Sequence, residues 1–156
     1  MDLETLNNLP KRDFVEMLKD VWPDGIWIAE TVEDKRPFQS IRSLHQSMAD
    51  VVKNATARQK LSLLDAFNTP QMKDQLRQRI DHAQEDLEGE EPLHKAFEAY
   101  ENQFGFPYFA ALDLDDLLPE PDELNGRLDN DLGEERMFAL RYVSEQARAR
   151  LEKLLK

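Results

Sequence analysis

The chain has 156 residues, of which 40% are hydrophobic, and a formal net charge of −12. This length suits one domain with its own hydrophobic core, and the negative charge disfavours nucleic acids and anionic membranes as partners. The absence of cysteine excludes disulfides and thiolate chemistry, and with neither a signal peptide nor a long apolar segment we expect a cytoplasmic protein.

A composition poor in glycine and rich in Leu, Ala, Glu, Gln, Lys and Arg favours helices over strands. We therefore expect an all-α fold, organised as a single compact multi-helix domain over residues 1–156. The first apolar stripe at helical spacing runs from Lys11 to Trp22. Pro23-Asp24-Gly25 interrupts it, and the apolar residues 26–28 fit either a helical turn or a buried connector.

Two helices are predicted in the next segment. An apolar stripe predicts the first over residues 38–55. Thr56 and Gln59 have the spacing of a capping box and begin the second. It should end near Phe67, because Asn68-Thr69-Pro70 favours a turn.

The centre of the chain predicts two more helices of different character. Residues 71–88 are polar with a narrow apolar stripe, so this helix should lie on the surface. Pro92 suits the first turn of a helix that ends at Phe104-Gly105. Residues 106–112 are the most apolar run, and we expect them to be buried as extended or irregular backbone.

The C-terminal part predicts a loop, a short helix and a long helix. The acidic, proline-containing stretch 112–123 should lead into a short helix with Leu124 and Leu128. Neither this stretch nor residues 129–133 has the ligand spacing of a calcium loop, so no metal site is predicted. Residues 134–155 form an amphipathic pattern that fits intramolecular packing, the commoner explanation, or a homodimer interface.

Three motifs in this order and approximate spacing resemble one enzyme family. It comprises the decarboxylases of 2-oxo-4-hydroxy-4-carboxy-5-ureidoimidazoline (OHCU), which follow urate oxidation and release (S)-allantoin. The motifs are Arg36-Pro37-Phe38-Gln39-Ser40; Tyr100 followed by Phe104-Gly105-Phe106-Pro107-Tyr108; and Arg127-Leu128-Asp129-Asn130 followed by Glu134-Glu135 and the helix from Ala139 to Leu151.

The resemblance implies a helical, commonly dimeric protein that needs neither a metal nor an organic cofactor. Its pocket would be built from helix ends and the backbone of residues 104–107, and would hold a small, planar ureide-like anion. The ligand-binding residues expected on this basis are Arg36, Phe67, Asn68, Phe104, Gly105, Phe106 and Pro107.

The sequence departs from the family pattern at three polar positions. The family has a His-Pro pair where this chain has Phe67-Asn68, and that histidine is the proposed acid/base group. A Glu-Gln pair of the next helix is replaced by Gln78-Arg79 or nearby residues, and a basic residue beyond the loop is replaced by Asp113. Since phenylalanine carries no titratable proton, the sequence assigns no catalytic residue at this position.

Three functional hypotheses remain open. The leading one is a divergent, catalytically inactive family member that retains a pocket for a small molecule or a partner. The second is an active decarboxylase on OHCU or a related ureide with a relocated acid/base group, for which His82 and Glu85 are the candidates. The third is an acidic protein-interaction module. No constellation around His45, His82 or His94 can be assembled from sequence, and each fits a partly exposed helix position.

Overall fold

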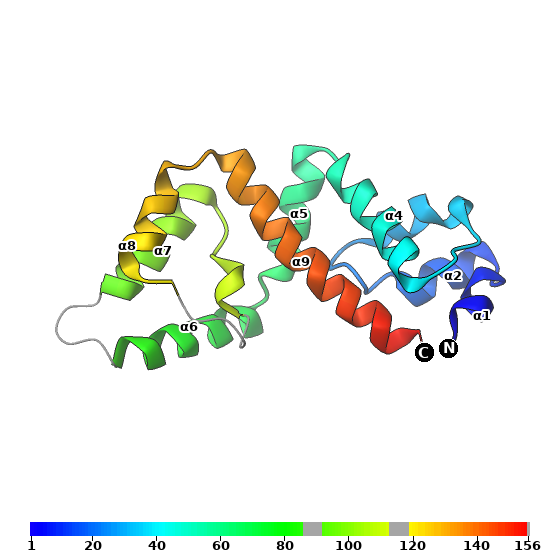
Figure 1. The fold of residues 1–156 in the computed structure, drawn as a ribbon, viewed down its shortest axis with the longest axis horizontal. Coiled ribbons are helices and arrows are strands. Elements are labelled where there is room, and N and C mark those ends of the chain that lie inside the picture. The colour runs from blue at the N-terminus through cyan, green and yellow to red at the C-terminus, as the bar shows by residue number, and fades with distance from the viewer. Residues whose placement is uncertain (86–91, 113–118, 156) are drawn as a thin grey trace. The chain divides into compact units, whose positions relative to one another are not determined.

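The computed structural model describes residues 1–85, 92–112 and 119–155, and within these ranges it contains helices and turns but no strand (Figure 1). The predicted all-α fold class is confirmed. Contacts divide the chain into a first unit, Met1–Ala66 with Val143–Lys156, and a second unit, Phe67–Tyr142. Two helices, α5 (Ala57–Phe67) and α9 (Leu132–Leu154), contribute residues to both units. The organisation as one domain stays a prediction.

In the first unit, α3 packs against both α2 and α4. The core of this unit is apolar and includes the fully buried side chains of Phe14, Trp22, Ile28 and Leu44. Its helical elements are α1 (Leu3–Asn7), α2 (Lys11–Leu18), α3 (Ile26–Val32), η1 (Glu33–Lys35), α4 (Ile41–Lys53), residues 57–66 of α5 and the C-terminal part of α9.

The helix predicted over residues 11–22 ends earlier, at Leu18. Val21 and Trp22 follow in a turn and are still buried, which explains why the apolar stripe continued beyond the helix. Gly25 is required at the next bend, since a Cβ there would lie 2.5 Å from the Cβ of Trp22. Of the two alternatives for residues 26–28, the helical one is observed, as the first turn of α3.

The predicted start of α4 at residue 38 is wrong by three residues. Ser40 caps the helix, with the side chains of Ser40 and Ser43 each accepting a hydrogen bond from the other residue's backbone N–H. Phe38 is buried ahead of the helix, and the Asn7 side chain bonds both its N–H and its C=O. Burial of Phe38 therefore comes from tertiary contacts and not from the helical stripe.

In the second unit, α7 packs against α6, α8 and η3, and α6 also contacts η2. The irregular backbone predicted for residues 106–112 is partly wrong, because residues 109–112 form a 3-10 turn. The elements are α6 (Pro70–Glu85), α7 (Pro92–Phe104), η2 (Phe109–Leu112), α8 (Pro121–Gly126), η3 (Arg127–Asp129) and the N-terminal part of α9.

Local capping signals predicted the ends of several helices correctly. The capping box at α5 is confirmed, with Gln59 N–H donating to Thr56 Oγ1 at 3.1 Å and Thr56 N–H donating to Gln59 Oε1 at 3.0 Å. The predicted ends at Phe67 and Phe104 are also confirmed. In the described part of the chain, no helix combines the length and apolarity that a membrane span needs.

Candidate functional site

The loop of residues 104–107, which we call the FGFP loop, begins where α7 ends. Gly105 has φ +83 and its N–H donates to the Glu101 carbonyl at 2.8 Å, which closes the last turn of the helix. A Cβ at Gly105 would meet no atom within 4 Å. The glycine is therefore needed for its left-handed backbone and not for space.

Aromatic side chains hold this loop in the core of the second unit. The Tyr100 ring lies 4.8 Å from the ring of Phe104, 6.3 Å from that of Phe106 and 5.4 Å from that of Tyr108, measured between centroids. Phe104 and Phe106 are 5% and 1% exposed. Their rings are thus packed inside the protein, so a ligand at this loop would meet its backbone rather than these rings.

A buried carboxylate, Glu135 of α9, joins this helix to α7 and η3. Its Oε1 accepts hydrogen bonds from the Tyr100 hydroxyl at 2.6 Å and from Arg127 Nε at 2.9 Å, while Oε2 accepts from Arg127 Nη2 at 3.0 Å and Asn130 Nδ2 at 2.9 Å. Arg127 also stacks over the rings of Tyr108 and Phe138, at 5.3 and 4.3 Å. We call Tyr100, Arg127, Asn130 and Glu135 the Glu135 network.

The network fixes the protonation of its members. Burial alone would raise the pKa of Glu135, but the hydrogen bonds from Tyr100, Asn130 and Arg127 outweigh burial and hold that pKa below its ordinary value. Burial and the hydrogen bond to Glu135 raise the pKa of Tyr100. Glu135 is therefore a carboxylate and Tyr100 a neutral donor at neutral pH, a pairing that suits a structural anchor better than proton exchange.

The end of α5 carries an aromatic residue inside the unit's core. Phe67 is 2% exposed, and its ring meets the rings of Phe109 and Tyr142 edge-on at 5.1 and 5.9 Å. Next to it, Asn68 Oδ1 is buried and, among the described residues, has no hydrogen-bond partner. Neither the phenyl ring nor the amide is titratable, so neither side chain can act as an acid or a base.

A pocket of about 470 Å³ lies on the face of α6 that is turned to η2. It is lined by Gln75, Gln78, Arg79, His82 and Leu112. We call this the α6–η2 pocket. His82, the candidate for a relocated acid/base group, thus faces a cavity together with both residues of the Gln78-Arg79 pair.

Two further predicted positions lie outside the described residues. Glu85 is the last residue of α6, but the structure does not describe its side chain. Asp113 also lies outside the described ranges. The proposed roles of both residues stay predictions.

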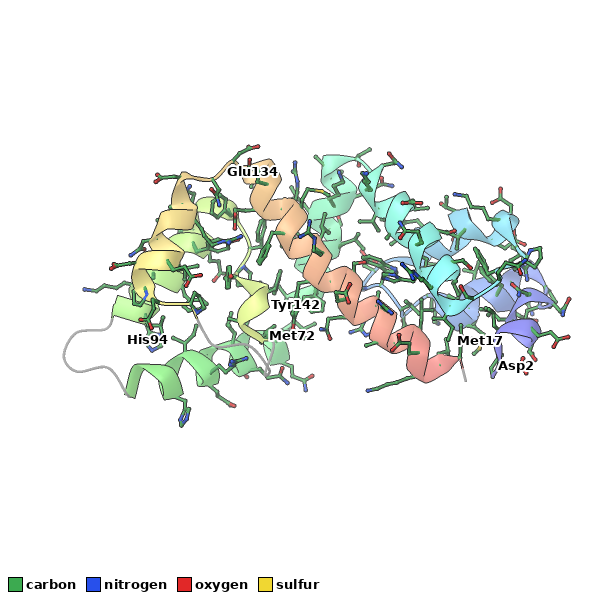
Figure 2. The ribbon with its side chains drawn as sticks, in the orientation of Figure 1. Asp2, Met17, Met72, His94, Glu134 and Tyr142 are labelled. Carbon is green, nitrogen blue, oxygen red and sulfur yellow. The ribbon has the colours of Figure 1, made fainter. Side chains whose placement is uncertain are left out.

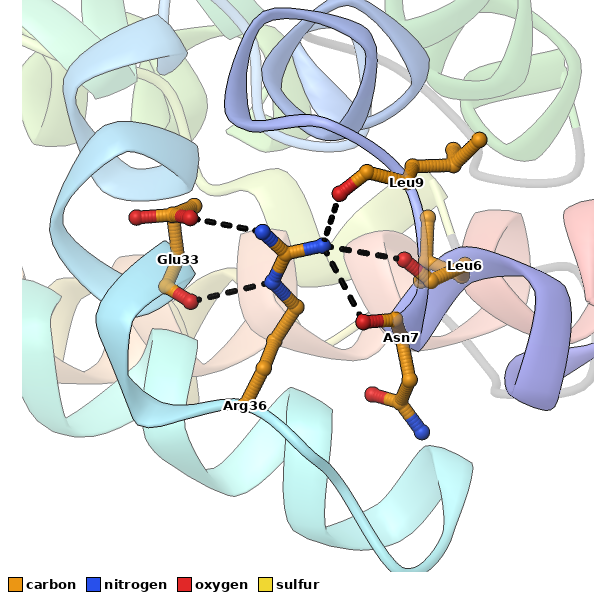
Figure 3. A network of polar contacts seen from close by, with 5 residues as sticks. All are labelled: Leu6, Asn7, Leu9, Glu33 and Arg36. Carbon is orange, nitrogen blue, oxygen red and sulfur yellow. Dashed lines mark hydrogen bonds and ion pairs between the residues drawn. The ribbon is translucent and has the colours of Figure 1, made fainter.

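Arg36 belongs to the first unit, where its guanidinium donates hydrogen bonds to protein oxygens (Figure 3). Nη1 donates to the carbonyls of Leu6, Asn7 and Leu9, and Nε and Nη2 donate to the carbonyl and carboxylate of Glu33. Nη1 therefore closes the C-terminal end of α1, while Nε and Nη2 hold the side chain on Glu33 of η1. A ligand-binding role for Arg36 stays a prediction that would have to compete with these bonds.

Two histidines bond partners that the sequence gives no signal for. His45 Nε2 lies 2.9 Å from the Ser144 carbonyl, and His94 Nε2 lies 2.8 Å from Asp81 Oδ1 across α6 and α7. Their partners are 99 and 13 residues away in the chain, so no local pattern marks them. Pro107 and His94 both line a second pocket, between α6 and α7.

Comparison with known proteins agrees with the helical architecture. The solved structure of an (S)-allantoin synthase superposes with a TM-score of 0.66 at 20% sequence identity, covering 99% of this chain and 54% of the other. The chain thus spans about half the length of that protein. At this identity the likeness concerns the fold.

Sequence relatives and a family model extend the likeness. The 2-oxo-4-hydroxy-4-carboxy-5-ureidoimidazoline decarboxylase of Halalkalicoccus jeotgali is 29% identical, over 99% of this chain and 92% of its own length. The uric acid degradation bifunctional protein of a Bacillus species is 28% identical, over 72% of this chain and 24% of its own length. The family model described as OHCU decarboxylase matches residues 7–152. The chain therefore belongs to the OHCU decarboxylase family, a family of purine catabolism.

Proposed function

We propose that this chain is a divergent member of its family that binds a small ureide-like anion in the α6–η2 pocket without decarboxylating it. The observation that carries the proposal is Phe67, which stands in the core at the end of α5 where the family pattern has a histidine. General acid–base catalysis contributes a factor of about 10² to 10⁴ in rate. A phenyl ring supplies none of it.

The lining of the α6–η2 pocket supports a ureide as ligand. The amides of Gln75 and Gln78 each present donors and an acceptor, as the ureido group does. Arg79 adds a cation that suits a carboxylate, and Leu112 adds apolar surface. The amides, the guanidinium and the apolar side chain can bind and orient a ligand, but none of them is an acid or base near neutral pH.

The binding proposal is tested with allantoate, an anionic ureide, and with neutral (S)-allantoin, by calorimetry or NMR titration. Because the Arg79 cation faces the pocket, allantoate should bind more tightly, and Arg79→Gln should weaken it about tenfold. The matched control is Arg77→Gln, which removes the same charge from another face of α6, away from this pocket. Equal losses in both variants, or equal binding of the two ureides, would contradict the proposal.

A second candidate function is favoured by one observation, the position of His82 in the α6–η2 pocket. On this alternative the chain decarboxylates OHCU or a related ureide with the His82 imidazole as the proton donor. Freshly generated OHCU would then disappear faster than it does spontaneously. The acceleration would be lost in His82→Gln and kept in His94→Gln, whose imidazole lines the other pocket.

Our leading proposal expects no acceleration by the unchanged chain. Phe67→His restores the family's residue type at the end of α5, but its ring would enter a slot lined by Phe109 and Tyr142. We therefore expect this variant to be less stable than the unchanged chain. We also expect it to be inactive, so that OHCU absorbance falls no faster than it does spontaneously. Turnover by the unchanged chain would overturn the inactive assignment and leave the binding assignment standing.

A further inference from the structure

The second unit contains another pocket that the proposed function does not use. It lies between α6 and α7, has a volume of about 340 Å³ and reaches Pro107 of the FGFP loop. This is at the small end of the range of ligand pockets. We call it the α6–α7 groove.

The groove has an apolar base. Leu76 and Ile80 of α6 and Phe97 of α7 line it, and each is between 6% and 8% exposed. The remaining exposed surface of these side chains faces the groove, where a ligand's apolar atoms would displace water. The base therefore favours a ligand with an apolar body.

The two rims of the groove carry opposite charges. Lys73 and Arg77 lie one helical turn apart on the α6 rim, and Glu98 and Glu101 lie on the α7 rim. Arg77 pairs with Asp74 of its own helix. Among the residues that the structure describes, Lys73, Glu98 and Glu101 form no ion pair, so the rims do not neutralise each other across the groove.

A polar contact between two side chains bridges the helices beyond these charged residues. His94 Nε2 lies 2.8 Å from Asp81 Oδ1, where the C-terminal part of α6 meets the N-terminal part of α7. From this contact the helices diverge (Figure 1), and His94 is labelled there in Figure 2. Asp81 and His94 join the helices at this end, and the charged residues of the two rims follow along α6 and α7 away from it.

We propose that the α6–α7 groove binds a small zwitterion whose charges are separated by an apolar body, as in a dipeptide with apolar side chains. The carboxylate would lie at the Lys73 and Arg77 rim and the ammonium group at the Glu98 and Glu101 rim. The apolar side chains would cover the base. This inference goes beyond the proposed function and does not depend on it, since the α6–η2 pocket uses another face of α6.

The test compares three forms of one peptide by NMR titration of the full chain. Leu-Phe carries both charges, N-acetyl-Leu-Phe lacks the ammonium group, and Leu-Phe amide lacks the carboxylate. Leu-Phe should saturate at millimolar concentrations and shift backbone signals of α6 and α7, and each blocked form should bind about fivefold more weakly, as expected for the loss of one exposed charge contact. Equal binding of the three forms, absence of saturation, or shifts confined to the α6–η2 pocket would overturn the proposal.

Variants with exchanged charges separate a binding role from a structural one. Lys73→Glu and Glu101→Lys should each weaken Leu-Phe binding, and the double variant should recover part of it because positions 73 and 101 again carry opposite charges while Arg77 and Glu98 are unchanged. Lys53→Glu, on an exposed position of α4, is the matched control and should bind as the unchanged chain does. Failure of the double variant to recover, with its fold verified by circular dichroism, would also overturn the proposal.

Discussion

In each unit an arginine stacks on an aromatic ring and donates hydrogen bonds to protein oxygens. Arg36 lies over the Phe14 ring at 4.6 Å, and Arg127 lies over the Phe138 ring at 4.3 Å. The side chains are 14% and 26% exposed. In both places the planar guanidinium fits an aromatic face and a set of oxygens at once.

The two arginines differ in what they neutralise. Arg36 mainly serves backbone carbonyls at a helix end, which carry partial charges. Arg127 serves Glu135, a full charge that is 1% exposed. The carbonyls that Arg36 serves carry only partial charges at a part-buried site, whereas Glu135 is a buried full charge, so the second unit should depend more strongly on its pair.

The largest effect is expected for Glu135→Gln. The substitution removes the charge that Arg127, Tyr100 and Asn130 share, and should cost about 3 kcal/mol of unfolding free energy. Urea denaturation measures this loss. The neighbouring, exposed Glu134 offers the matched control, and Glu134→Gln should change stability by less than about 0.5 kcal/mol. Similar effects of the two substitutions would contradict the claim that the second unit depends on the charge that Arg127 neutralises.

A smaller loss, about 2 kcal/mol, is expected for Arg36→Gln. The shorter amide cannot reach the Leu6, Asn7 and Leu9 carbonyls together, and Glu33 loses its ion pair. Hydrogen exchange should show faster opening of α1 in particular. Arg42→Gln, at an exposed position of α4, should leave both readouts unchanged; unaltered exchange in α1 would show that the capping bonds do not stabilise this helix.

Acid should affect the second unit through Glu135. Because its pKa is lower in the folded protein than in the unfolded chain, its contribution is complete above the unfolded value, about 4.3, and is lost as pH falls through the folded value. Between pH 6 and pH 3 the stability advantage over Glu135→Gln should shrink. Denaturant titrations at stepped pH values measure it, and a constant difference would contradict the assignment of a carboxylate.

The smallest effect is expected for Tyr100→Phe, about 1 kcal/mol, since one of four hydrogen bonds to Glu135 is lost while the ring packing stays. The pKa of Tyr100 is raised by burial and by Glu135, so its contribution is present below the unfolded value of about 10 and is lost at higher pH. Alkaline unfolding should therefore begin at higher pH in the variant. An identical alkaline midpoint would contradict this role.

Local signals in the sequence predicted much of the helical architecture. The Thr56–Gln59 capping box and the Phe104-Gly105 stop act within a few residues, so they could be recognised before any tertiary contact was known. The helix assigned to residues 11–22 was too long, because Val21 and Trp22 are buried by tertiary packing and not by helical geometry. The short α1 was missed, since five residues give no readable period.

The candidate site was less predictable than the fold. The family resemblance singled out Tyr100, Arg127 and Glu135. Only the structure shows that Tyr100 and Arg127 both donate to the carboxylate of Glu135. The Asp81–His94 pair joins two helices and has no signature in sequence. The same is true of the bonds from Arg36 to a helix end 27 residues or more away in sequence, while its ligand-binding role stays a prediction.

The division of the chain into units bears on the order in which they form during synthesis. The second unit is one uninterrupted stretch, Phe67–Tyr142, whereas the first needs Val143–Lys156 in addition to its N-terminal residues. Since a ribosome releases the chain from its N-terminus, the unit in the middle of the sequence can complete its contacts first. The N-terminal segment must wait, with part of its core exposed, until the last turns of α9 have emerged.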